Sequence, residues 1–197
     1  MTWYEDEVRQ LEQKTNAAQP DSTFFYGSSS IRLWTDLAAD FPTVNTVNAG
    51  FGGSTLAACA WFFDRLLAPA RPAHLILYAG DNDLGDNRHP EEVYLFFCAL
   101  ADKIGRTLPD TDVSFVSIKP SPARWNLINQ IRTTNALIER EIERLPRFSF
   151  IDLTPVMLAP DGGPRRELYE ADGLHMNRQG YLIWQRELST RVPALIR

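Results

Sequence analysis

The sequence contains few cysteines and few histidines, and it carries no excess of positive charge. Its two cysteines, Cys59 and Cys98, lie in apolar segments without a CxxC partner or a neighbouring histidine, which disfavours a zinc site. We expect both to be small buried side chains, and the sequence leaves a disulfide between them open. The chain has 20 Lys and Arg against 25 Asp and Glu, a formal net charge of -5, and no basic cluster. Nucleic-acid binding is therefore not expected, because it requires basic side chains that neutralise phosphates.

Long apolar segments are also missing. No stretch approaches the roughly 18 uninterrupted apolar residues of a membrane-spanning helix, and residues 1–9 lack the basic start and apolar run of a secretion signal. We therefore expect a cytoplasmic location and no membrane insertion. The composition, with 44% hydrophobic and 23% charged residues among 197, is that of an ordinary globular protein. Its length predicts one domain over residues 1–197, with residues 1–20 as an N-terminal helical extension.

Short apolar runs alternate with helical periods along the chain. In the extension, Tyr4, Val8 and Leu11 have helical spacing. Runs with strand character follow at residues 23–26, 44–47, 74–78, 113–118 and 148–153. Helical segments accompany them at residues 31–39, up to about 67, from about 91, at 128–145 and from about 178. This alternation predicts a three-layer α/β/α fold around a five-stranded parallel sheet. Such sheets bind ligands in the loops that follow the carboxyl ends of their strands.

The loop after the first predicted strand offers three hydroxyl groups in the sequence Gly27-Ser28-Ser29-Ser30. An ordinary turn, with Ser30 as the N-cap of the next helix, explains these residues as well as a functional site does. The segment does not match the nucleophile elbow G-x-S-x-G, because Ile31 stands where the second glycine should be. An ordinary α/β-hydrolase is therefore disfavoured.

The loop after the second predicted strand is rich in glycine. Residues 48–55 read Asn-Ala-Gly-Phe-Gly-Gly-Ser-Thr, which suits either a close backbone approach to a ligand or a turn that needs positive φ. Phosphate-binding motifs do not fit this loop. The P-loop lysine is missing, and Thr55 stands at the last glycine position of G-x-G-x-x-G.

The loop after the third predicted strand is acidic and reads Gly80-Asp81-Asn82-Asp83. Asp81, Asp83 and Glu92 have the spacing of calcium ligands, but Asp86 stands at the required glycine, which disfavours a calcium site. A surface cluster of Asx turns is the alternative to a functional role.

An acid and a histidine lie three residues apart near the end of the chain, in Asp172-Gly173-Leu174-His175. In one tight turn the carboxylate can reach Nδ1 of the imidazole, which leaves Nε2 to accept a proton. That geometry suits a general base, although an exposed acid and histidine are also common on protein surfaces. We interpret the other two histidines, His74 at the start of a predicted strand and His89 directly before Pro90, as structural.

Together these loops supply a hydroxyl, backbone N–H donors, a side-chain amide and an acid–base pair. Three of these loops follow the carboxyl end of a predicted strand, and the fourth lies directly before the last predicted helix. Acyl transfer needs this set of groups.

The combination resembles the GDSL-type esterases of the SGNH-hydrolase family, whose four blocks carry serine, glycine, asparagine and histidine in this order. The resemblance covers the chain from Phe24 to Tyr181. Its four blocks are Phe25-Tyr26-Gly27-Ser28-Ser29, Asn48-Ala49-Gly50-Phe51-Gly52-Gly53, Gly80-Asp81-Asn82-Asp83 and Asp172-Gly173-Leu174-His175. It implies a flavodoxin-like fold and a serine esterase that needs no metal or organic cofactor.

The resemblance also implies a role for each matching residue. Ser29 falls on the nucleophile, His175 on the general base and Asp172 on the acid that orients it. The oxyanion hole would consist of the N–H groups of Ser29 and Gly53 and the amide of Asn82. The family usually has aspartate where this chain has Ser28. Ser28 and Ser30 are therefore alternative nucleophiles, and a non-catalytic protein that binds a ligand on the same fold is the alternative to an enzyme.

The short chain leaves little length for a lid domain or a deep acyl tunnel, so we expect a small-molecule ester with a small acyl group such as acetyl. Phe51, Trp125 and Arg124 are candidate substrate contacts, whereas Trp34 is expected in the core. Lys119 and Arg124 would meet an anionic substrate or form solvated surface charge. Carbohydrate esters, lysophospholipids and thioesters all remain open.

Overall fold

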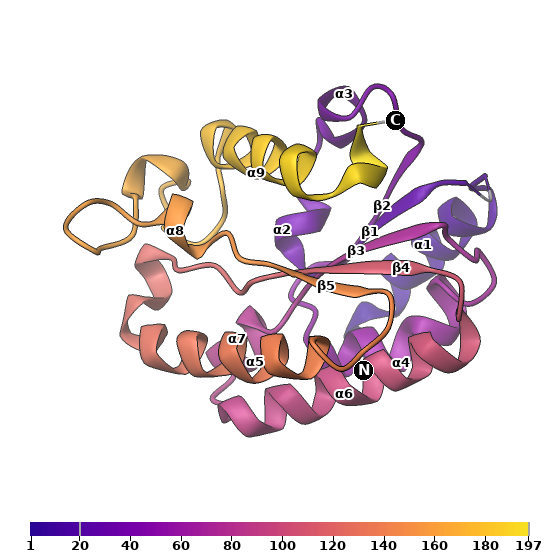
Figure 1. Ribbon diagram of the computed structural model, residues 1–197, viewed down its shortest axis with the longest axis horizontal. Coiled ribbons are helices and arrows are strands. Elements are labelled where there is room, and N and C mark those ends of the chain that lie inside the picture. Colours follow the sequence, from indigo (N-terminus) through magenta and orange to yellow (C-terminus); the bar gives the residue numbers. More distant parts are fainter. Residues whose placement is uncertain (20, 197) are drawn as a thin grey trace.

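The computed structural model describes residues 1–19 and 21–196 and has a five-stranded parallel sheet at its centre (Figure 1). The strand order is β2-β1-β3-β4-β5. The strands are β1 (Thr23–Gly27), β2 (Thr46–Gly50), β3 (His74–Tyr78), β4 (Asp112–Val116) and β5 (Phe148–Ile151). This architecture confirms the predicted three-layer fold. The boundary predicted at residue 20 lies outside the described residues, as does residue 197.

Helices cover both faces of the sheet (Figure 1). One face is covered by α1 (Glu5–Asn16), α4 (Leu56–Leu66), α6 (Pro90–Thr107) and α7 (Ile128–Ile142). The other face is covered by α2 (Ser29–Arg32), α3 (Leu37–Asp40) and α9 (Arg178–Arg191). The remaining helical elements are short: η1 (Thr2–Tyr4), α5 (Asp81–Gly85), η2 (Pro122–Leu127), α8 (Thr154–Met157), η3 (Arg166–Leu168) and η4 (Pro193–Leu195).

The two hydrophobic cores follow from the alternation of side chains along each strand. In β1, Phe24 and Tyr26 belong to the core under α1 and α4, whereas Phe25 belongs to the core under α9. All three are fully buried. A strand buried on both faces reads as an uninterrupted apolar run, which is why the central strands were recognisable in the sequence.

The strand register brings three loops to the same edge of the sheet. Gly27 at the end of β1 pairs with Gly50 at the end of β2 and with Tyr78 at the end of β3. Gly27 has φ +135°, and a Cβ there would lie 1.8 Å from the carbonyl oxygen of Tyr78. Only glycine therefore allows the chain to turn here, and the turn delivers Ser28–Ser30 to this edge.

Several elements differ from their predicted bounds. β4 and β5 end at Val116 and Ile151 rather than at residues 118 and 153. Residues 31–39 form two short helices, α2 and α3, rather than one. The helix stops because Trp34 turns into the core, where its indole donates to Asp40 Oδ2 at 2.6 Å. The second strand lies at Thr46–Gly50 instead of 44–47, because Thr46 pairs with Thr23 and Gly50 can pass close to the backbone of Arg32.

None of the helices formed by residues 1–19 and 21–196 combines the length and the apolar character that crossing a membrane requires.

Candidate active site

Ser29, His175 and Asp172 form a chain of hydrogen bonds at the carboxyl edge of the sheet. Ser29 is the first residue of α2, directly after β1, and the other two lie in the loop before α9. Ser29 Oγ lies 3.1 Å from His175 Nε2. His175 Nδ1 lies 2.6 Å from Asp172 Oδ2. The structure therefore brings together three residues that the sequence placed at opposite ends of the chain.

The carboxylate of Asp172 is held as an anion. Its Oδ1 accepts the N–H groups of Leu174 at 2.8 Å and His175 at 3.0 Å, while Oδ2 faces the imidazole. The hydrogen bond with His175, followed by the N–H of Leu174, lowers the pKa of Asp172 to about 2. An ionised acceptor at Nδ1 assigns the proton of the neutral imidazole to that nitrogen. Nε2 is then an acceptor for the hydroxyl of Ser29.

The neighbouring serines have other surroundings. Ser28 and Ser30 are each 2% exposed, whereas Ser29 is half-buried. Ser28 donates its N–H to the carbonyl of Tyr78 at 3.0 Å, and the carbonyl of Ser30 accepts the hydroxyl of Tyr181 at 3.1 Å. The helix begins at Ser29, so the N-cap position belongs to Ser28 and not to Ser30.

The glycine-rich loop follows β2 at the same edge of the sheet, next to the end of β1. Gly53 is exposed and has φ +67°, a conformation that favours glycine. The next residue, Ser54, accepts a hydrogen bond at its carbonyl from Asn82 Nδ2 at 3.0 Å. Among the described residues, no acceptor is bonded to the N–H of Ser29 or of Gly53. These two N–H groups and the second N–H of the Asn82 amide are therefore available to an anion.

Asn82 is held on its oxygen side by a buried ionic network. Arg124 Nη2 donates to Asn82 Oδ1 at 3.1 Å, and Arg124 Nη1 lies 2.6 Å from Asp81 Oδ1. Lys119 Nζ reaches Asp81 Oδ2 at 3.2 Å, and its residue is 1% exposed. Burial alone would raise the pKa of Asp81, but Lys119 and Arg124 outweigh it and hold the pKa below its ordinary value. Asp81 is therefore a buried anion with two cationic partners.

Comparison with known proteins places this arrangement in a family. A model of the GDSL-like Lipase/Acylhydrolase family matches residues 17–183. The chain belongs to this family of hydrolases. The match includes all four loops at the carboxyl edge and leaves α1 outside. The comparison with curated proteins found no match.

Solved structures share the fold of this GDSL-like hydrolase at low sequence identity. A protein from Streptococcus pneumonia described as a platelet activating factor has a TM-score of 0.83 at 20% identity, over 96% of this chain and 94% of that chain. A GDSL-like lipase from Bacteroides thetaiotaomicron has a TM-score of 0.79 at 18% identity, over 94% and 97%. A carbohydrate esterase family 3 protein from Talaromyces cellulolyticus has a TM-score of 0.71 at 14% identity, over 89% and 98%.

The structure corrects the prediction that Phe51 contacts substrate in this GDSL-like hydrolase, and it gives Arg124 and Lys119 ionic partners within the chain. Phe51 is 0% exposed and packs edge-on against Tyr4 and Phe62, so it belongs to the core and cannot meet a ligand. Arg124 is half-buried and directs its guanidinium to Asp81 and Asn82, so it is not a solvated surface charge, and its contact with substrate stays a prediction. Lys119 is likewise neither surface charge nor a substrate contact, because it is buried against Asp81.

The remaining tryptophans, cysteines and His89 that the sequence analysis discussed have the following positions. Trp34 is 1% exposed, which confirms its place in the core. Trp125 is half-buried on η2, and its contact with substrate stays a prediction. Cys59 is buried as expected, whereas Cys98 is half-buried, which corrects the expectation for that residue, and both are free thiols. His89 precedes α6, where its N–H donates to Glu92 Oε2 at 2.9 Å.

Sequence reasoning missed the network around Asp81. Its partners Lys119 and Arg124 lie 38 and 43 residues further along the chain, and no local spacing connects them to Asp81. It also missed Asp83, which is 1% exposed and accepts the N–H of Leu56 at the start of α4 with both oxygens, at 3.1 and 2.9 Å. Acidic residues that begin three residues after a buried strand were the signal available in the sequence.

A small hollow of about 270 Å³ lies beside His175. Its polar rim includes Asp36, Glu170, Asn177 and Arg178. Within the described part of the chain, no three His, Cys, Asp or Glu side chains are arranged to hold a metal ion.

Proposed function

We propose that this GDSL-like hydrolase is a serine esterase that cleaves small acyl esters through an acyl-enzyme intermediate. The observation that supports it is the continuous contact from Ser29 Oγ through His175 to Asp172, at 3.1 and 2.6 Å. A hydroxyl bonded to an imidazole, which is itself bonded to a carboxylate, is the arrangement that activates a nucleophile.

The first half of the reaction forms the acyl-enzyme. His175 Nε2 accepts the proton of Ser29 as Oγ attacks the carbonyl carbon of the ester. Asp172 stays ionised and stabilises the imidazolium that forms. The imidazolium then protonates the leaving alcohol as the bond between the acyl carbon and that oxygen breaks.

The developing oxyanion needs donors that are already in place. The N–H groups of Ser29 and Gly53 and the free N–H of the Asn82 amide supply them. Asn82 donates a hydrogen bond to the carbonyl of Ser54, the residue after Gly53, so this contact connects its amide to the loop that carries the Gly53 N–H. In the second half of the reaction, His175 deprotonates a water molecule that attacks the acyl carbon and releases Ser29.

The surroundings of His175 favour a polar alcohol as the leaving group. The alcohol that His175 protonates must lie beside the imidazole, where the hollow has a rim of Asp36, Glu170 and Asn177. These side chains form hydrogen bonds with hydroxyl groups, as a sugar would offer. One solved structure with this fold is a carbohydrate esterase and another is an acetyl esterase. We therefore propose an acetyl or similarly small ester of a polyhydroxylated alcohol.

Hydrolysis of p-nitrophenyl acetate by the purified chain and by Ser29→Ala tests the proposal. We expect kcat to fall by at least about 10³-fold in Ser29→Ala. Ser189→Ala is a matched control, because Ser189 is also half-buried on a helix but lies on α9 away from this edge. Rates of the wild type and Ser29→Ala that both equal the rate without protein would indicate the alternative, a protein that binds its ligand without catalysis, and equal rates above it would indicate another nucleophile.

A fluorophosphonate probe identifies the nucleophile separately. We expect peptide mass spectrometry to place the adduct on Ser29, and an adduct on Ser28 or Ser30 would contradict the assignment. A series of p-nitrophenyl esters from acetyl to octanoyl then tests the acyl group. We expect kcat/KM to fall with chain length, whereas a lysophospholipase or a long-chain thioesterase would show the opposite trend.

A further inference from the structure

The N-terminal segment contacts the glycine loop although it lies outside the match to the family. That match begins at residue 17, after the end of α1. Tyr4, directly before α1, donates its hydroxyl to the carbonyl oxygen of Gly53 at 2.9 Å. Glu7, on α1, accepts the N–H of Gly52 at Oε2, also at 2.9 Å. Two side chains of one helical turn therefore hold two consecutive glycines.

These two contacts lie on either side of one peptide group. The N–H of Gly53 belongs to the peptide between Gly52 and Gly53. The N–H of Gly52 lies on the peptide before it, and the carbonyl of Gly53 lies on the peptide after it. Fixing both neighbours fixes the direction of the N–H between them. Glycines have more backbone freedom than any other residue, so such a stretch depends on external contacts for its direction.

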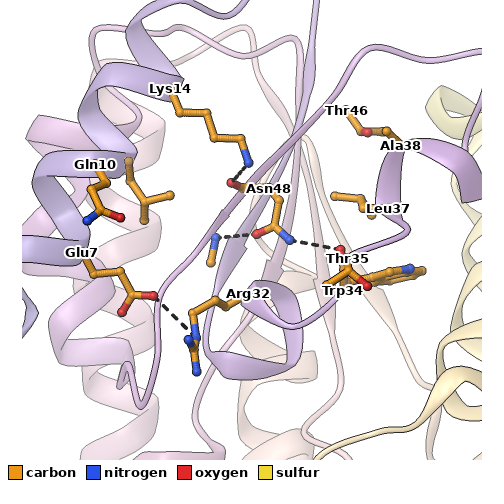
Figure 2. Close-up of a pocket in the computed structure, with 12 residues that line it drawn as sticks. Glu7, Gln10, Lys14, Arg32, Trp34, Thr35, Leu37, Ala38, Thr46 and Asn48 are labelled. Atoms are coloured by element: carbon orange, nitrogen blue, oxygen red, sulfur yellow. Dashed lines mark hydrogen bonds and ion pairs between the residues drawn. The ribbon is translucent and has the colours of Figure 1, made fainter.

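Glu7 also connects this loop to the helix that carries Ser29. Glu7 Oε1 lies 3.5 Å from Arg32 Nε, and Figure 2 shows this ion pair between α1 and α2. A cleft of about 450 Å³ separates the two helices. The carboxylate of Glu7 therefore contacts both the donor loop and α2, where Ser29 and Arg32 are three residues apart.

The hydroxyl of Tyr4 is held firmly enough to orient its partner. Tyr4 is 6% exposed, and its ring packs edge-on against Phe51 and Phe62 with centroids 5.3 and 6.0 Å away. Burial raises the pKa of Tyr4, so the hydroxyl stays protonated and remains a donor. The following helix is attached to α4 through Arg65, which contacts Glu5 and Glu12 at 2.9 and 2.6 Å.

We infer that Tyr4 and Glu7 are positioning residues that hold the N–H of Gly53 toward the oxyanion. This inference rests on the proposed function, in which Gly53 is one of the oxyanion donors. It makes the N-terminal segment part of the catalytic architecture rather than an accessory helix.

Tyr4→Phe removes one hydroxyl and keeps the ring in the core. We expect kcat for p-nitrophenyl acetate to fall about tenfold with KM within twofold of the wild type, because a misdirected donor weakens binding of the transition state only. Tyr26→Phe is the matched control. Tyr26 is buried in the same core and donates to the carbonyl of Cys59 at 2.8 Å, but that carbonyl lies in α4. We expect this control to lose comparable stability in a urea titration and to keep its kcat.

Glu7 is tested with a pair of variants. Glu7→Ala removes the acceptor of the Gly52 N–H, and we expect a similar fall in kcat at unchanged KM. Glu7→Gln keeps an acceptor oxygen while removing the charge, and we expect it to restore most of the activity. If Glu7→Gln is as impaired as Glu7→Ala, the hydrogen bond to Gly52 is not what matters and the inference for Glu7 is wrong.

The inference and the proposed function fail in different ways. Full activity in Ser29→Ala would overturn the proposed function. A large loss in Ser29→Ala, together with a kcat in both Tyr4→Phe and Glu7→Ala equal to that of Tyr26→Phe, would overturn only the inference. A rise in KM at constant kcat in the Tyr4 and Glu7 variants would also overturn it, because it would indicate a role in binding the substrate.

Discussion

Arg124 donates a hydrogen bond from Nη2 to Asn82 Oδ1 at 3.1 Å, and this contact fixes which end of the amide faces the site. The amide nitrogen of Asn82 donates to the carbonyl of Ser54, so the oxygen must point to a donor elsewhere. An asparagine rotated by half a turn would present its oxygen to the oxyanion and repel it. The ion pair between Arg124 and Asp81, at 2.6 Å, holds the guanidinium in place.

Arg124→Lys is therefore expected to lower kcat about tenfold with little change in KM. Lysine can keep the charge beside Asp81, but it lacks the planar set of donors that reaches two partners at once. The measurement is steady-state hydrolysis of p-nitrophenyl acetate. Arg88→Lys serves as the control, because Arg88 is exposed and its guanidinium pairs with Glu92, one turn further along the chain.

A double-mutant cycle decides whether Arg124 acts through Asn82. Asn82→Ala should lower kcat by about 10²- to 10³-fold, which corresponds to roughly 3 to 4 kcal/mol for one oxyanion donor. Adding Arg124→Lys to Asn82→Ala should then have little further effect, because the amide that Arg124 orients is gone. Full additivity of the two losses would show that Arg124 acts elsewhere.

Asp172→Asn should lower kcat by about 10³- to 10⁴-fold at neutral pH without loss of the fold, because an amide can donate to Nδ1 and favour the wrong tautomer of His175. In the wild type, the pKa of Asp172 is about 2, so the carboxylate is ionised throughout the neutral range. The check is kcat at pH 7 together with labelling of Ser29 by the fluorophosphonate. A variant within tenfold of the wild type would remove Asp172 from the mechanism.

The fold and the centre of the site were readable from the sequence because their signals are local. Asp172 and His175 lie within one turn, and β3 at His74–Tyr78 is an apolar run whose bounds match the prediction. The network of Asp81, Lys119 and Arg124 was not readable. Its charges are buried only because they compensate one another, and this compensation depends on which loops the sheet brings together.

The burial of the aromatic residue Phe51 could not be predicted from the sequence either. Phe51 lies between glycines in a loop, where the sequence favours neither a ligand contact nor the core. The structure buries it because η1 and α1 cover this loop and place Tyr4 against its ring. The contact between Tyr4 and Gly53 spans 49 residues, and no pattern in the sequence indicates it.

Asp83 should make the stability of the chain depend on pH. Burial, which outweighs its hydrogen bonds with the N-terminus of α4, raises the pKa of Asp83 from its ordinary value of 3.8 to about 6. Between these values the folded state binds the proton more tightly than the unfolded state, so stability falls as the pH rises. We expect deprotonation of Asp83 to lower the free energy of unfolding by about 1 kcal/mol as the pH is raised from 5 to 7.

Urea titrations of the wild type and Asp83→Asn at pH 5 and pH 7 measure this effect. Asparagine keeps an acceptor for the N–H of Leu56 but carries no proton to lose. The difference between the two proteins therefore isolates Asp83 from all other titrating groups. We expect Asp83→Asn to gain stability relative to the wild type at pH 7, and an identical pH dependence of both proteins would contradict the raised pKa.

Gly27→Ala should destabilise the chain by roughly 3 kcal/mol or more, since it combines a strained backbone with overpacking. The backbone at Gly27 has φ +135°, and the new Cβ would lie 1.8 Å from the carbonyl oxygen of Tyr78 on the neighbouring strand.

Gly105→Ala provides the control at a glycine where a side chain has room. Gly105 is exposed within α6, and a Cβ there meets nothing within 4 Å. We expect Gly105→Ala to raise stability by about 0.5 to 1 kcal/mol, because alanine has the higher helix propensity. Because the turn at Gly27 places Ser29 opposite His175, folded Gly27→Ala protein should also react more slowly with the fluorophosphonate. Wild-type stability and labelling in Gly27→Ala would show that the strand ends can separate without moving the nucleophile.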